Sequence, residues 1–312
     1  MNDPFNIALR LALYLDLMLL FGIALFGLYS LRGHERESGA ILNFRPLLTC
    51  GSFAGVVLSL GYMMGLAMTM SGATEMGELH HHIFEMVLMG TEVGLTWMVR
   101  IGTLVLAGTV MLLPGLKPLT RLWAVTFFSA VALATLAWTG HGAMDEGSRR
   151  FWHFSADILH IWSAAAWLGA LGAFVLMLRL KALKDKHLVS VLDRSLAGFE
   201  SAGAVIVFVI SATGIVNYLF IVGPTLEGLW TTTYGILLSA KLALFAAMII
   251  LAALNRFHLS PLLKRTLLAG EYSVAIHALR RSMVVELSAA VLILCLVAWL
   301  GTLSPEMEMA SE

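Results

Sequence analysis

The chain has 312 residues, of which 59% are hydrophobic and 13% are charged, and its mean hydropathy is +0.86. A soluble domain of this length has too little interior for so much apolar sequence, so the composition excludes an ordinary water-soluble fold. The formal net charge is zero, and we expect lipid rather than nucleic acid around the protein.

Long apolar runs recur along the whole chain, which predicts an all-α polytopic membrane protein with eight transmembrane helices. The expected helices cover about residues 7–30, 47–70, 92–113, 119–140, 153–178, 199–222, 233–255 and 282–303. Their connections are mostly short, and no soluble domain is visible between them. We therefore expect a single integral-membrane domain over residues 1–312.

The basic residues predict the orientation of these helices. The loops after the first, third, fifth and seventh helices, with their flanks, carry 15 of the 20 Lys and Arg residues. By the positive-inside rule these loops face the cytoplasm, so both termini are expected to be periplasmic.

The segment from Trp138 to Gly169 carries the strongest functional pattern. His153, Asp157 and His160 are spaced i, i+4, i+7, so they share one face of the fifth helix, which enters the membrane from outside. Ionisable residues inside a membrane helix are costly and indicate a functional site. His141 and Met144 precede this helix in the outer loop, and the five residues together are our candidate metal site.

Methionine and histidine are also enriched around the outer end of the second helix. Thioether and imidazole ligands together suit copper, which makes this region a candidate capture surface for incoming metal. The alternative is that Met fills gaps in the core and that the His run is a solvated turn. The capture residues are Met68, Met70, Met76, His80, His81 and His82.

Three further charges lie near the middle of expected helices: Asp16, Arg100 and Lys241. Buried charges must be paired or line water, so we expect a polar cluster in which Asp16 and Asp157 offset Arg100 and Lys241. This cluster either stabilises helix packing or lines a path for an ion. Glu286 is expected to be solvated or to reach the membrane surface.

Several segments resemble the bacterial copper-resistance inner-membrane proteins of the CopD/PcoD type, and the resemblance spans essentially the whole chain. The matching segments are T-G-H-G at 139–142, D-I-L-H-I-W-S-A-A-A-W-L-G at 157–169, T-T-Y-G-I-L-L-S-A-K at 232–241, Asn255, and Gly301 with Pro305. The matched positions transfer a functional role to His141, Asp157, His160 and Lys241.

The resemblance implies a multi-pass protein of the bacterial inner membrane that serves copper homeostasis and resistance. It implies copper, in an unspecified oxidation state, as the ion that is bound and moved from periplasm to cytoplasm. It further implies a separate periplasmic copper-binding partner of the CopC type.

Two other functions stay open at the level of sequence. A b-type haem electron-transfer protein also places histidines on neighbouring membrane helices, although none of the helices expected here has a histidine embedded in its inner half. A regulatory protein that binds copper without moving it would carry the same ligands. We expect no enzyme, because motifs for hydrolytic or phosphate chemistry such as G-x-S-x-G, the P-loop and H-E-x-x-H do not occur.

Overall fold

The computed structural model describes residues 4–303 apart from positions 38, 40, 73–80, 180–182, 184–185 and 225–228, and at positions 81, 83, 141, 144 and 179 it describes the backbone alone. The described residues form helices and no strand. The α-helices are α1 (Pro4–Tyr29), α2 (Phe44–Ser71), α3 (His81–Gly90), α4 (Glu92–Leu112), α5 (Pro118–Ala134), α6 (Gly147–Arg179), α7 (Lys186–Ile221), α8 (Thr233–Leu254), α9 (Ser260–Ala269) and α10 (Ser273–Leu300). Short 3-10 helices cover Gly33–Arg36 (η1), Thr135–Thr139 (η3) and His141–Met144 (η4), and a π-helix covers Asn255–Leu259 (η7).

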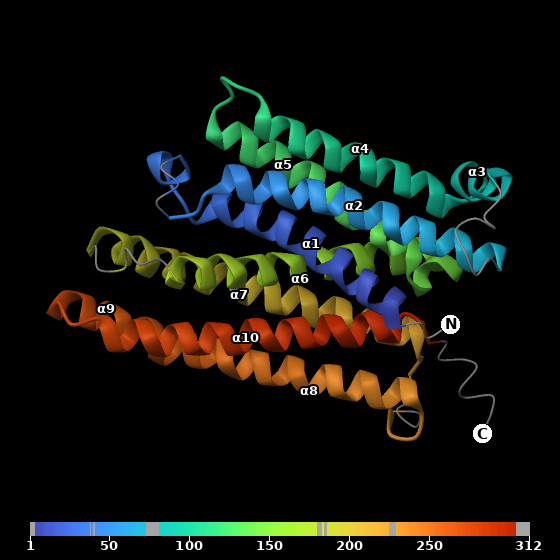
Figure 1. Ribbon diagram of the computed structural model, residues 1–312. Coiled ribbons are helices and arrows are strands. Elements are labelled where there is room, and N and C mark those ends of the chain that lie inside the picture. The colour runs from blue at the N-terminus through green and yellow to red at the C-terminus, as the bar shows by residue number, and fades with distance from the viewer. Residues whose placement is uncertain are drawn as a thin grey trace.

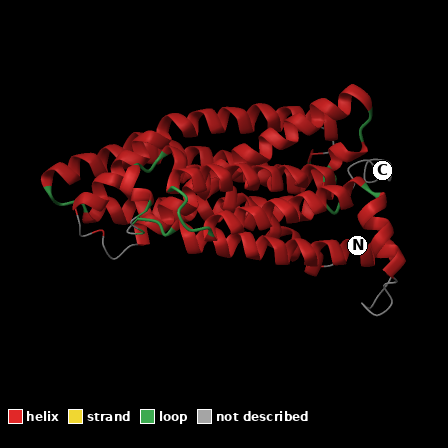
Figure 2. Ribbon diagram, turned by 90° about the horizontal axis from the view of Figure 1, so that it is seen from above, coloured by secondary structure: helices red, strands yellow, loops and turns green. Residues whose placement is uncertain are grey.

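Eight of the described helical segments are long and apolar enough to cross a membrane, which confirms the predicted fold class. The helices run along one long axis and form an elongated bundle (Figures 1 and 2). α1 begins and α10 ends at one end of this bundle (Figure 1), which we call the terminal end. The opposite end, with η1 and the α4–α5 and α9–α10 turns, is called the basic end.

Four helix boundaries and one short helix differ from the sequence prediction, and one of these boundaries is the start of α10, at Ser273 rather than at about 282. α6 begins at Gly147 and α7 at Lys186, because both helices continue as polar turns beyond the apolar segment that a hydropathy pattern detects. The seventh span does not stop near residue 255 but continues through the π-helix into α9. The segment His81–Gly90, expected as loop, is the short helix α3, whose Val87 is buried.

α1 and α6 form the centre of the bundle. Their apolar windows are 56% and 72% buried, whereas the corresponding values for α7 and the α8–α9 span are 11% and 6%. The two central helices meet where Gly22 and Gly169 touch, and a Cβ at Gly169 would lie 2.3 Å from the Cα of Gly22. Small residues allow such backbone contact between membrane helices. Phe26 and Phe174 then pack edge to face, with ring centroids 5.1 Å apart.

Local sequence signals fix where the helices near the site begin. Thr232 caps α8, because its hydroxyl accepts a hydrogen bond from the amide of Gly235 at 3.0 Å. Lys241 then lies slightly more than two turns into the helix. Gly147, the first residue of α6, has φ of 60°, a left-handed conformation that favours glycine.

Candidate functional site

The predicted polar face of α6 packs against α7 near the terminal end. His153 stacks on Phe220 with ring centroids 5.0 Å apart, Asp157 accepts a hydrogen bond from Asn217, and His160 contacts Thr213. The α7 partners are spaced by three and four residues, so they also share one helix face. Sequence reasoning identified the α6 half of this contact and missed the α7 half.

His153 is the most constrained of the candidate ligands, with 1% of its surface exposed. Its Nδ1 lies 2.5 Å from Oδ2 of Asp145. Its Nε2 is buried and has no hydrogen-bond partner among the described residues, and it lies 4.0 Å from Oδ2 of Asp157. A carboxylate on one ring nitrogen fixes the ring orientation and leaves the other nitrogen available to a ligand.

Asp145 was not among the predicted site residues. It lies three residues after the T-G-H-G segment, and its other carboxylate oxygen accepts from Arg149 at 3.0 Å. Because it lies in a loop, no helical periodicity linked it to His153. An acidic residue that follows a histidine-containing loop was the available signal.

The T-G-H-G turn lies directly against the α6 face. A Cβ placed at Gly142 would lie 3.3 Å from Cγ of His153 and 3.5 Å from Oδ2 of Asp157, and one at Gly140 would lie 3.6 Å from the same oxygen. Of these contacts only the one between Gly142 and His153 is tighter than usual, so Gly142 is the position where the lack of a side chain lets η4 approach His153. The backbones of His141 and Met144 lie in η4, while their side chains fall outside the described atoms.

Asp157 and His160 extend the polar face toward the middle of the bundle. Asn217 donates its side-chain N–H to Oδ1 of Asp157 at 2.7 Å, and Nδ1 of His160 lies 2.9 Å from the hydroxyl oxygen of Thr213. Lys241 of α8 interacts electrostatically with both Asp157 and His160. The structure thus brings Lys241 to the site, as the pairing of Asp157 with a basic residue predicted.

The other two members of the predicted polar cluster lie elsewhere. Arg100 is 2% exposed and donates to Thr135, with Nε 2.7 Å from the hydroxyl oxygen. Asp16 faces α2, where a Cβ at Gly55 would lie 2.7 Å from its Oδ2. Among the described residues no ion pair joins Asp16 to Arg100 or Lys241.

The capture residues lie on α2, on α3 and in the segment between them. Met70 is 57% exposed at the terminal end of α2, Met68 is half-buried, and His82 is exposed on α3. Met76, His80 and the side chain of His81 lie outside the described residues. α2 and α3 pack chiefly against α1 and α4, so this surface and the His153 face belong to different sides of the bundle.

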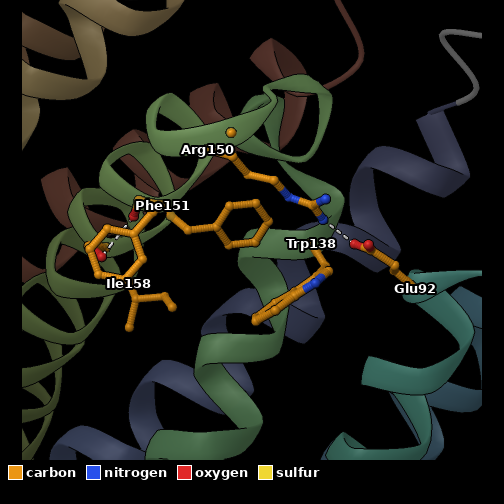
Figure 3. A pocket seen from close by; sticks show the side chains of 8 residues that line it. Glu92, Trp138, Arg150, Phe151 and Ile158 are labelled. Carbon is orange, nitrogen blue, oxygen red and sulfur yellow. Dashed lines mark hydrogen bonds and ion pairs between the residues drawn. The ribbon is translucent and has the colours of Figure 1, made fainter.

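A surface pocket occupies the opposite face of α6. Glu92, Trp138, Arg150, Phe151 and Ile158 line it, and Arg150 and Glu92 form an ion pair across it (Figure 3). The pocket lining includes no histidine, cysteine or methionine. Among the described residues, no three His, Cys, Asp or Glu side chains form a group that could hold a metal ion.

A bundle of eight membrane-length helices with a buried His–Asp–His face near one end defines a multi-pass membrane protein with a polar site between its helices. The chain belongs to the copper resistance protein D family. Residues 1–152 match the family model "Copper resistance protein D-like, N-terminal domain", and residues 193–300 match "Copper resistance protein D".

Curated relatives agree with this assignment. The chain is 56% identical over 308 residues to "Copper resistance protein D" of Pseudomonas syringae pv. tomato, covering 99% of each chain. It is 28% identical to "Inner membrane protein YebZ" of Escherichia coli (strain K12), covering 83% of this chain and 86% of the relative. It is also 28% identical to "Copper transport protein CutJ" of Bacillus subtilis (strain 168), covering 81% of this chain and 46% of the relative. No solved structure matches the chain.

The family and the relatives confirm the resemblance seen in the sequence. The protein is a copper-resistance protein of the bacterial inner membrane, with eight apolar spans. Its relatives are copper resistance and transport membrane proteins, which favours copper over haem as the ion or cofactor concerned. The single domain over residues 1–312 stays a prediction.

Proposed function

We propose that the protein binds copper at its periplasmic face through His153 and carries it toward the cytoplasm. The observation that supports this most directly is the buried Nε2 of His153, which has no hydrogen-bond partner among the described residues. Imidazole nitrogen is a good copper ligand, and a buried nitrogen without a partner is unfavourable unless a ligand binds it. Asp145 holds the other nitrogen and thereby orients the ring.

The remaining ligands come from residues next to His153. The carboxylate of Asp157 lies on the Nε2 side of the ring, and His141 and Met144 belong to η4, whose Gly142 lies against His153. Imidazole, carboxylate and thioether together accept copper in either oxidation state. His160 is the next imidazole on the same face, seven residues or about 10 Å further into the bundle.

The distribution of charge supports a periplasmic location for this site. The loops that carry most of the basic residues gather at the basic end (Figure 1), opposite the terminal end. Under the positive-inside rule the basic end is cytoplasmic, so the terminal end, with both chain termini, is periplasmic. Copper reaching His153 therefore comes from the periplasm, either directly, from the Met and His residues of α2 and α3, or from a separate CopC-like protein.

The transport step draws its support from a relative. The Bacillus subtilis relative is named a copper transport protein, and its similarity covers 81% of this chain. Inward movement would use the seam of α6, α7 and α8, because this seam holds His153, Asp157, His160 and Lys241 together. A protein that binds copper only as a regulator would keep the site but show no net movement of copper.

Copper binding and uptake by purified protein test the proposal. We expect near-stoichiometric copper, no haem absorbance, and copper accumulation in vesicles that contain the protein. His153→Ala should lower copper affinity at least tenfold and abolish uptake, whereas His277→Ala, which removes an exposed histidine near the basic end, should change neither. Asp157→Asn, which preserves shape, repeats the test if the alanine variant does not fold. Unchanged copper binding in both folded site variants would refute the site, and binding without uptake would refute transport.

A further inference from the structure

Glu286 of α10 lies in a second buried polar cluster, separate from the His153 site. The sequence-based expectation that it is solvated or reaches the membrane surface is wrong, because only 2% of it is exposed. Trp167 of α6 donates its indole N–H to Oε1 at 2.9 Å, and Asn255 donates its amide N–H to Oε2 at 2.9 Å. The cluster thus joins three helical segments near the middle of α10.

Within the described chain, no cation forms an ion pair with this carboxyl. The side chains that face it, Trp167 and Asn255, do not titrate. On α10 itself, the ionisable residue nearest to Glu286 in sequence is Arg281. The elements that pack against α10 carry ionisable residues as well, among them Asp16 on α1, His160 on α6, Lys241 on α8, and Arg256 and His258 in η7. A carboxylate held between neutral partners inside a membrane protein is costly, so the site favours neutralisation by a bound positive ion.

Asn255 provides a second, independent sign that something binds here. It is 7% exposed, and its Oδ1 is buried without a hydrogen-bond partner among the described residues. Its Nδ2 contacts the carboxylate, and rotating the amide by a half-turn exchanges nitrogen and oxygen. After that rotation Oδ1 accepts a hydrogen bond from a protonated Glu286. The pair therefore makes one complete hydrogen bond in either protonation state, with one amide orientation for each.

The π-helix connects this pair toward the basic end. The amide of Ser260 donates to the carbonyl of Asn255 across the wide π-turn, and the Ser260 hydroxyl donates to Oε1 of Glu200 at 3.1 Å. Glu200 in turn interacts electrostatically with Asp193 of α7, and Asp193 also interacts electrostatically with Lys264 of α9. π-helical turns inside longer helices are frequent at functional sites. Ser260 and Glu200 thus extend the polar groups from the π-helix toward the basic end, and Ser260 is linked to Asn255 through the backbone.

We propose that Glu286 and Asn255 form a proton-binding site, which exchanges its proton with the cytoplasmic side through Ser260 and Glu200. One proton adds to Oε2 of the carboxylate, and the charge of the site changes from −1 to 0. The described ligands at this cluster are oxygens, with no sulfur or imidazole, which suits a proton rather than copper. Occupying this site while copper leaves the His153 site would couple the two movements, and only that coupling rests on the proposed copper transport.

Infrared spectroscopy of the copper-free protein in lipid tests the proton site by itself. A protonated buried carboxyl gives a carbonyl stretching band that shifts on H/D exchange. We expect a pH-dependent band of this kind in the wild type, its loss in Glu286→Gln, and its retention in Glu271→Gln, which removes an exposed carboxyl at the basic end. Asp16→Asn controls for another buried carboxyl and should also retain the Glu286 band. The glutamine variant keeps an acceptor for Trp167 and offers an amide N–H to Asn255.

Each outcome decides the matter. A band that persists unchanged in Glu286→Gln overturns the proposal. If that variant does not fold, Asn255→Ala replaces it. A shift of the band's pH midpoint by about one unit supports the proposal, since the hydrogen bond to the charged carboxylate is stronger than the bond to the neutral acid by about that much, and an unshifted midpoint overturns it. Because no copper is present, a positive result stands even if copper uptake fails, and uptake without the band would refute the proton site alone.

Discussion

The contact between α1 and α6 predicts that Gly169→Ala destabilises the protein. A methyl group at Gly169 would lie 2.2 Å from the carbonyl carbon of Gly22 and 2.3 Å from its Cα, while one at Gly22 would lie 2.0 Å from the carbonyl oxygen of Ala165. Ordinary carbon contacts lie at about 3.5–4.0 Å. All of these atoms belong to the backbone and cannot rotate away, so the two central helices must separate by roughly 1 Å or more.

The size of the effect follows from two opposing contributions. Inserting a methyl group into a well-packed core costs about 1–3 kcal/mol, and rigid backbone neighbours place this site at the upper end. Replacing Gly by Ala inside a helix returns about 1 kcal/mol through helix propensity. The expected net loss of unfolding free energy is about 2 kcal/mol, which corresponds to roughly thirtyfold in the unfolding equilibrium.

Reversible unfolding in mixed micelles, followed by far-ultraviolet circular dichroism, measures this loss. Gly102→Ala and Gly198→Ala are matched controls, because both glycines lie in helices and a Cβ at either meets no atom within 4 Å. The controls should gain up to about 1 kcal/mol from helix propensity. A Gly169→Ala variant that is as stable as these controls would refute the backbone contact between α1 and α6.

Two further predictions concern the two ends of the bundle. Asp145→Asn should weaken copper binding about 10–100-fold, because it removes the carboxylate that orients His153, whereas Glu146→Gln should leave copper binding unchanged. Competition titration with a chelator measures the copper affinity of both variants. An Asp145→Asn variant that binds copper as tightly as the wild type would refute the role of Asp145. At the basic end, partial burial acts to raise the pKa of Glu35, but hydrogen bonds from Arg194 and the Arg32 amide outweigh it and hold this pKa below its usual value of 4.5. A carboxyl whose pKa is lowered by folding stabilises the fold at pH values above its usual pKa, and this stabilisation is lost as the pH falls through the lowered pKa. Glu35→Gln should therefore be less stable than the wild type at neutral pH and equally stable in acid. A stability difference that does not change with pH would contradict this.

The fold was predictable because membrane-spanning helices depend on the length of apolar sequence. All eight expected spans have counterparts in the structure, with the second, for example, expected at 47–70 and found as Phe44–Ser71. The errors occur where helices continue into polar sequence, as in the first turns of α6 and α7. The π-helix at Asn255 was also beyond prediction, because it depends on packing that no local pattern encodes.

The candidate site was predictable on one helix and not across helices. The spacing of His153, Asp157 and His160 shows their common face, since a regular helix fixes it. It does not show that Asn217 and Thr213 contact that face, because many residues of α7 have the same spacing. For the same reason the pattern could not tell whether Asp157 pairs with Arg100 or Lys241, which lie at similar depths on different helices.

One face of α6 contributes side chains to both polar clusters, the His153 site and the cluster around Glu286. Trp167 lies seven residues beyond His160, so the side chain that contacts Glu286 continues the same helix face as the candidate copper ligands. Trp167 also packs edge to face on Phe245 of α8, with ring centroids 6.0 Å apart. The next residue on that α8 face is Met248, which is 4% exposed and carries a thioether. Under the two proposals above, copper enters from the end of the bundle that holds His153, whereas the proton reaches Glu286 from the basic end. If both proposals hold, copper and protons occupy separate polar clusters on α6, and coupling between them would act through the packing of α6 against α10, where Trp167 contacts Glu286.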